Sequence, residues 1–161
     1  MDSERIPCGL ATGNLKLDMI NFRKNVPSLS DIERAERLKL VIEALYEINK
    51  SIPVIVEGKK DASALRRLGL AGEIITLHRG KSIYEFCTDI EERFHRVIIL
   101  LDWDKKGNNL NKTLSENLKG HWEEFSSFRE LLRLICQKDI RDIEGIPKLL
   151  RRLEGDENPW Y

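Results

Sequence analysis

Three acidic side chains stand where two apolar segments of the chain end. Glu57 follows the apolar run at 53–56, and Asp102 and Asp104 follow the run at 96–101. Both runs are too short for helices and rich in β-branched residues, which indicates buried strands. Residues i and i+2 of an extended segment project the same way, so the two aspartates should project together. Clustered carboxylates repel unless a cation neutralises them, and oxygen ligands suit Mg²⁺, with Mn²⁺ as a substitute.

The aspartates also have a simpler structural explanation. A strand-end Asp commonly caps the next helix or forms a turn, and an isolated Asp-x-Asp pair usually binds no metal. The neighbouring residues favour a site here, because Gly107 follows Asp104 by three positions and the earlier strand ends in the pair Glu57 and Gly58. We therefore predict that Glu57, Asp102 and Asp104 converge on one metal ion.

Strands alternate with helices along the chain, which is typical of a mostly parallel sheet with helices on both faces. The expected fold class is α/β and Rossmann-like, with a central sheet of about four strands. Ligands of such sheets bind at the carboxyl ends of the strands, where the acids stand. Strands are expected at 53–57, 73–77 and 96–101, with 121–125 as a last strand or a loop. Helices are expected at 30–50, 61–69, 82–94, 110–120, 127–137 and 147–153.

The chain divides into an irregular N-terminal arm at 1–29 and one domain at 30–161, with its core at 53–120. The arm has little periodicity and contains several Pro and Gly residues. An added N-terminal helix and C-terminal helices flank the core. The apolar stripe of the helix at 30–50 fits either packing on the sheet or a dimer interface.

Composition limits the function classes. Lys and Arg number 27 and Asp and Glu number 27 among 161 residues, so the net charge is zero and a general polycation is excluded. Any phosphate-binding surface must be a local patch. No apolar run approaches the roughly 20 residues of a membrane span. Three scattered cysteines exclude a zinc ribbon and indicate a reducing, cytoplasmic location.

Basic residues and glycines surround the acidic strand ends. As a group, the basic side chains could form the positive rim that a nucleic-acid backbone needs, although any single one is equally well a solvated surface residue. They are Lys59, Lys60, Arg79, Lys81, Lys105 and Lys106. Gly58, Gly80 and Gly107 are expected to permit special backbone angles or close approach at the site, and simple turn formation explains Gly107 equally well.

These motifs together resemble the Toprim domain, which is shared by topoisomerases, bacterial-type primases, some nucleases and recombination proteins. The resemblance covers residues 53–120 and rests on VIVEGKKD at 54–61, Gly80, and IILLDWDKKG at 98–107. The chain resembles most the short stand-alone Toprim proteins of archaea and bacteria, also in its C-terminal stretch at 128–145. A similar Glu-Gly-Lys start occurs in the ribonuclease that matures 5S ribosomal RNA.

The resemblance implies that Asp102 and Asp104 bind Mg²⁺ and that Glu57 is a metal ligand or a general acid/base in phosphoryl transfer. It favours a small nuclease, a hydrolase acting on structured RNA or DNA, with RNA preferred. A non-catalytic module that binds nucleic acid or a ribonucleoprotein partner uses the same residues. An aspartyl-phosphate-type phosphatase ranks lower, because Lys106 stands where that class has Thr or Val.

Overall fold

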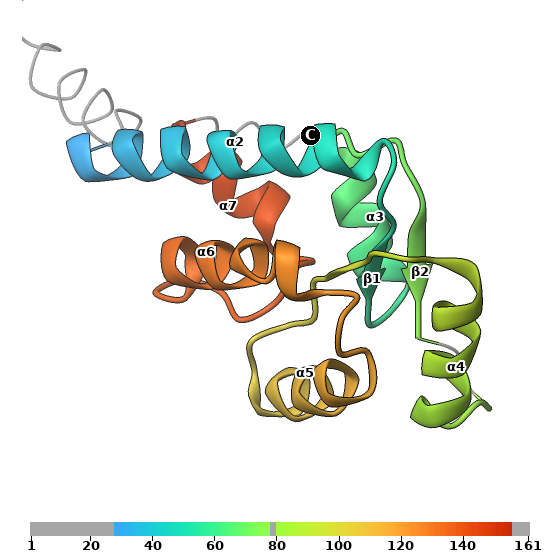
Figure 1. The fold of residues 1–161 in the computed structure, drawn as a ribbon. Coiled ribbons are helices and arrows are strands. Elements are labelled where there is room, and N and C mark those ends of the chain that lie inside the picture. The colour runs from blue at the N-terminus through green and yellow to red at the C-terminus, as the bar shows by residue number, and fades with distance from the viewer. Residues whose placement is uncertain (1–27, 78–79, 156–161) are drawn as a thin grey trace, which may run out of the picture.

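A computed structural model describes residues 28–77 and 80–155 (Figure 1). The arm predicted at 1–29 lies outside the described residues, except for Ser28 and Leu29 at the start of the first described helix. Arg79 of the predicted basic rim also lies outside them. The sheet, the acidic strand ends and the remaining basic residues are all described.

The central sheet is parallel, and its strand order is β2-β1-β3. The strands are β1 (Val54–Val56), β2 (Ile74–Thr76) and β3 (Ile98–Ile99). Val54 is in register with Ile74 of β2 and with Ile98 of β3. The predicted α/β fold with a parallel sheet is confirmed. Because β1 and β3 are direct neighbours, Glu57 and Asp102 lie at the same edge of the sheet.

The prediction of about four strands is wrong for the described part of the chain, which has three. The segment at 121–125 instead contains the short 3₁₀ helix η1 (Glu123–Phe125). The Glu123 carboxylate accepts hydrogen bonds from the backbone N–H groups of Gly120 and Trp122, which closes a local turn. The N–H groups of Gly120 and Trp122 are therefore satisfied within the turn. The segment contacts residues 95–97 through the Val97 N–H, which donates to the His121 carbonyl, through His121 Nδ1 at the His95 carbonyl, and through the ion pair of Arg96 with Glu124.

Helices cover both faces of the sheet, as the alternation of elements predicts. Val54, Val56 and Ile98 contribute to one core and Ile55 and Ile99 to the other, because successive strand residues point to opposite faces. The first core is covered by α2 (Leu29–Asn49), α3 (Lys59–Arg67), α6 (Ser127–Cys136) and α7 (Ile146–Leu153). The second is covered by α4 (Ile83–Arg93) and α5 (Lys105–Asn117).

Helix α2 packs within the chain. Its buried side chains Ala35, Leu38, Ile42 and Leu45 join the same core as residues of α6 and α7, and the helix runs across both in Figure 1. The apolar stripe is thus accounted for by packing inside the domain. None of the described helices is long and apolar enough to cross a membrane.

The buried side chain of Asn49 joins the end of α2 to the starts of two strands. Its Nδ2 donates to the carbonyls of Ile52 and Glu73, each at 3.0 Å, and its Oδ1 accepts from the Gly72 N–H at 2.9 Å. Replacing Asn49 with Ala would leave these buried groups without partners. We expect Asn49→Ala to lower the free energy of unfolding by about 2 kcal/mol, measured by urea denaturation. An unchanged midpoint would contradict this assignment.

Candidate metal and nucleic-acid site

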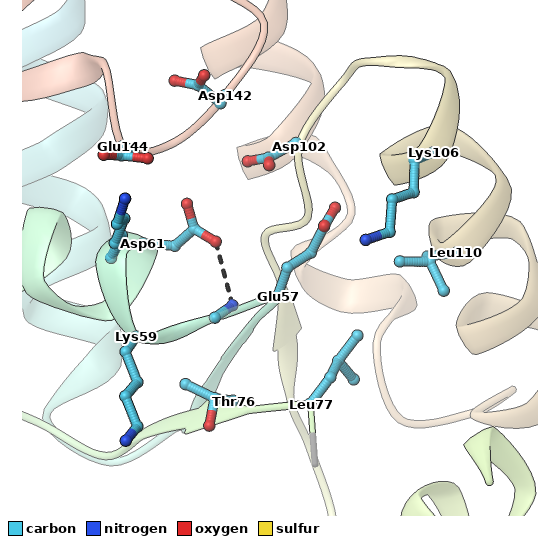
Figure 2. Close-up of a pocket in the computed structure, with 12 residues that line it drawn as sticks. Glu57, Lys59, Asp61, Thr76, Leu77, Asp102, Lys106, Leu110, Asp142 and Glu144 are labelled. Atoms are coloured by element: carbon cyan, nitrogen blue, oxygen red, sulfur yellow. Dashed lines mark hydrogen bonds between the residues drawn. The ribbon is translucent and has the colours of Figure 1, made fainter. Parts of the chain in front are cut away.

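A cleft of about 880 Å³ lies at the carboxyl edge of β1 and β3. Its walls come from the end of β1, the start of α3, the end of β2, the segment after β3 and the loop that precedes α7 (Figure 2). The charged residues that matter most for its chemistry are Glu57, Asp61, Asp102, Lys106, Asp142 and Glu144. The fold therefore gathers five carboxylates from distant parts of the chain.

Glu57 directly follows β1, and its carboxylate points into the cleft toward Asp102 (Figure 2). Its Oε1 atom is buried and has no hydrogen-bond partner among the described residues. Burial raises the pKa of Glu57, and the negative charge of Asp104 adds to the rise, while the nearby backbone N–H of Asp102 lowers it and Lys106 lowers it to a smaller extent. A buried oxygen without a partner is costly, so this atom is suited to accept a cation, a water or a proton.

Asp102 follows β3 and is held from the C-terminal part of the chain. Its Oδ1 accepts a hydrogen bond of 2.9 Å from the backbone N–H of Ile143. Burial raises the pKa of Asp102 to about 7, opposed by the Ile143 N–H and increased by nearby charges that include Asp61 and Glu57. Glu57 and Asp102 are thus two facing carboxyl groups that both resist ionisation, mainly because they are buried. A cation bound between them would favour the ionised form of each.

Asp104 has a different geometry. It is the N-cap of α5, where its Oδ1 accepts a hydrogen bond of 2.6 Å from the Gly107 N–H. It is not among the residues that line the cleft, although its charge raises the pKa of Glu57. The helix-cap explanation therefore describes this side chain, and its role as a metal ligand stays a prediction.

Three further acids of the cleft were not among the predicted site residues. Asp61 is only 7% exposed, and its Oδ2 accepts a hydrogen bond from the Gly58 N–H. Burial raises its pKa. Asp142 and Glu144 come from the loop before α7, far from the predicted core. Their acid-x-acid spacing, the same as in Asp102 and Asp104, is the signal that could have identified them.

The predicted basic rim is only partly assembled at the cleft. Lys59, Lys60 and Lys106 line it, and Figure 2 shows Lys106 pointing toward Glu57 while Lys59 points away from the acids. Lys105 is exposed at the start of α5 and does not line the cleft. Lys81 forms an ion pair with Asp89 of α4 and lines a separate, smaller pocket.

The three predicted glycines differ. A Cβ atom at Gly58 would meet nothing within 4 Å, so no close approach requires glycine there. Gly80 has a φ of +91°, a backbone conformation that favours glycine. A Cβ atom at Gly107 would lie 2.1 Å from the Asp102 carbonyl oxygen, so the first turn of α5 lies directly against the backbone of Asp102.

The carboxylates fit Mg²⁺ better than a metal that needs a closed protein cage. Across residues 28–77 and 80–155, no three His, Cys, Asp or Glu side chains are arranged to hold a metal ion together. Mg²⁺ needs only one or two carboxylates, since waters and substrate phosphates complete its shell. The unpartnered Glu57 oxygen and the facing Asp102 carboxylate match that smaller set of ligands.

Comparisons with known proteins identify the family. The model of the Toprim domain matches residues 53–134, which include all three strands, Glu57, Asp102 and Asp104. The chain belongs to the Toprim family. This membership gives it a metal-binding function related to nucleic acids.

Its relatives include small archaeal proteins. A UPF0292 protein of Methanosarcina barkeri is 33% identical over 135 residues, covering 78% of this chain and 91% of the relative. A UPF0292 protein of Thermococcus sibiricus is 37% identical over 124 residues, covering 76% of this chain and 95% of the relative. Among solved structures, a protein from Aquifex aeolicus matches with a TM-score of 0.55 at 28% identity, covering 65% of this chain and 94% of that one.

The raised pKa of Asp102 predicts a pH-dependent stability of the metal-free Toprim chain. The native state holds a proton on Asp102 up to a pH of about 7, and the unfolded state loses it near 3.8. This group's stabilisation is therefore complete below 3.8 and is lost as the pH rises to about 7. We expect Asp102→Asn in EDTA to match the wild type at pH 4 and to exceed its unfolding free energy by about 1–2 kcal/mol at pH 8.

Denaturant unfolding of both proteins across this pH range checks the prediction. Adding Mg²⁺ at pH 8 should stabilise the wild type and leave Asp102→Asn nearly unchanged, because only the ionised carboxylate binds the cation strongly. A constant difference between the two proteins at every pH would contradict the assignment.

Proposed function

We propose that this Toprim protein is a Mg²⁺-dependent nuclease that cleaves structured nucleic acid, RNA in preference to DNA, in the cytoplasm. Glu57 and Asp102 are the central residues, with Asp104 as a further ligand candidate. The preference for RNA is supported by the resemblance of the Glu57-Gly58-Lys59 start to the ribonuclease that matures 5S ribosomal RNA.

The observation that carries the proposal is the pairing of Glu57 and Asp102 in one cleft. They follow neighbouring parallel strands and face each other, and Oε1 of Glu57 is buried with no hydrogen-bond partner in the part of the chain that the structure describes. A purely structural carboxylate would be satisfied by a hydrogen bond or an ion pair. A site that binds a cation and a phosphate would instead present a carboxylate oxygen that has no protein partner.

Mg²⁺ bound by these carboxylates would neutralise charge on the scissile phosphate and lower the pKa of a bound water. Glu57 can act as a general acid/base, since its raised pKa brings proton exchange closer to neutral pH. Asp102, fixed by the Ile143 N–H, keeps its remaining lone pairs directed into the cleft. Lys106 points at the same place and can bind a phosphate oxygen of the substrate.

The direct test is cleavage of a labelled RNA hairpin by the purified chain in Mg²⁺ and in EDTA. We expect product only with Mg²⁺, with Mn²⁺ as a substitute, and less product from a DNA hairpin of the same sequence. Asp104→Ala is the third variant to test beside Glu57→Gln and Asp102→Asn, since it decides whether the helix cap is also a ligand. Cleavage that persists in EDTA would overturn the proposal.

A second candidate is a Toprim module that binds RNA or a ribonucleoprotein without cleaving it. It is favoured by the geometry of Asp104, which caps α5 and is not among the residues that line the cleft. This module would bind the hairpin in gel-shift assays without Mg²⁺-dependent product. The nuclease would both bind the hairpin and give a Mg²⁺-dependent product.

A further inference from the structure

Arg129 of α6 contacts the backbone of Leu101 and Asp102 and does not line the cleft. Its Nε donates to the Leu101 carbonyl at 2.9 Å, and its Nη2 donates to the Asp102 carbonyl at 2.5 Å. Nη2 also donates to Oδ1 of Asn108 at 2.8 Å. One planar guanidinium thus joins the end of the β3 segment to the first turn of α5.

The side chain of Arg129 is partly buried, and burial lowers its pKa. The charge of Arg133 lowers the pKa further, while the charges of Glu130, Asp102 and Glu57 raise it. Within the described residues no carboxylate lies in ion-pair distance of Arg129. The acceptors of its three hydrogen bonds are instead two backbone carbonyls and one side-chain amide oxygen.

The two carbonyls that Arg129 holds belong to the backbone that carries Asp102. The same short segment is fixed on its other side, where the Trp103 N–H donates to the Arg141 carbonyl at 3.0 Å and Trp103 Nε1 donates to the Ile140 carbonyl at 2.7 Å. The side chain of Trp103 is buried. Residues 101–103 are therefore held between α6 and the segment at 140–143.

We propose that Arg129 is a positioning residue that fixes the backbone at Leu101 and Asp102 and so sets the place of the Asp102 carboxylate opposite Glu57. The inference rests on the proposed metal site. A metal ligand must be held within a fraction of an ångström, and groups behind the ligands commonly do this. Arg129 suits the task because two nitrogens of its rigid, planar guanidinium contact two successive carbonyls, whereas a lysine has a single nitrogen on a flexible stem.

The first test needs no metal and no substrate. In EDTA, hydrogen exchange at the Ile143 and Gly107 amides reports directly on Asp102 and Asp104, since these amides donate to the two carboxylates. Arg129→Lys keeps the charge and removes the fork. We expect it to speed exchange at both amides about tenfold relative to the buried Val54 amide.

Arg133 supplies a matched control, because it lies one turn later on α6 and its guanidinium contacts Glu130 and Gln137 instead. Arg133→Lys should leave both amides unchanged. Asn108→Ala removes one of the three acceptors at an exposed residue, so it tests the same clamp if Arg129→Lys fails to fold. Asn108→Ala should also speed hydrogen exchange at the Gly107 amide. Wild-type exchange at these amides in both Arg129→Lys and Asn108→Ala would overturn the inference.

The second test is binding of Mn²⁺ alone, followed by electron paramagnetic resonance. We expect affinity to fall at least about tenfold in Arg129→Lys, because the carboxylate is displaced while the local charge is kept. Unchanged affinity would overturn the positioning role. If the wild type binds no Mn²⁺, the proposed function fails, and the exchange experiment still decides whether Arg129 fixes Asp102.

Discussion

Replacing Glu57 with Gln is expected to lower the rate of Mg²⁺-dependent RNA cleavage at least about 100-fold. The amide keeps the size of the side chain and cannot exchange a proton or offer a charged oxygen. Asp102→Asn should have an effect of similar size, because it removes the facing carboxylate that holds the cation. Single-turnover cleavage of the labelled hairpin measures both rates.

The control for these variants is Glu47→Gln, which makes the same change at an exposed residue of α2 that pairs with Lys50. Its cleavage rate should equal that of the wild type. Hairpin affinity measured by fluorescence anisotropy separates lost chemistry from lost binding, and we expect it to change less than the rate does in Glu57→Gln. A Glu57→Gln protein that cleaves at the wild-type rate would exclude Glu57 as a catalytic group.

The central part of the fold could be predicted because its signals are local. Short runs of β-branched residues identified β1, β2 and β3, and alternation with helices fixed their parallel direction. Once β1 and β3 are neighbours, Glu57 and Asp102 must share an edge of the sheet. The predicted convergence of these residues depended on that adjacency, which the alternation of elements does not give and which the strand order of the structure supplies.

The parts that were missed depend on contacts between distant segments. Asp142 and Glu144 reach the cleft because the loop before α7 returns to the edge of the sheet. Their acid-x-acid spacing marks them as candidates, but it does not say that this loop meets the ends of β1 and β3. The helix cap at Asp104 was an open alternative in the sequence, and the start of α5 decides it, because the helix begins at Lys105 and not at 110 as expected. The expected last strand failed for a local reason, since the Glu123 carboxylate closes a turn at Gly120.

The acidic cleft also explains how a chain without net charge can interact with nucleic acid. Lys59, Lys60 and Lys106 bring positive charge to the walls, but the carboxylates outnumber them there. A phosphate would be repelled from the empty cleft and attracted once a divalent cation is bound. Substrate binding at this edge should therefore depend on the metal, and binding in EDTA would indicate that RNA contacts another surface.

Gly107→Ala is expected to lower the free energy of unfolding by about 3 kcal/mol, because the added Cβ overlaps backbone that cannot easily move. That atom would lie 2.1 Å from the Asp102 carbonyl oxygen and 2.6 Å from its carbonyl carbon. The same carbonyl accepts a hydrogen bond from Arg129. To make room for the added Cβ atom, either α5 or the backbone at Asp102 must therefore shift. Mn²⁺ affinity should therefore fall at least about tenfold as well.

The sign of this effect separates two explanations of the glycine. If Gly107 served only as a turn former, Ala would stabilise the protein by up to about 1 kcal/mol, since Gly107 lies inside α5 and Ala favours helices. Gly58→Ala is the matched control at the same cleft, because a Cβ atom there meets open space and its φ is an extended −149°. Urea denaturation should show a large loss for Gly107→Ala and little change for Gly58→Ala. A stabilised Gly107→Ala protein would show that α5 can move away from Asp102, and that close packing of this turn does not hold the carboxylate in place.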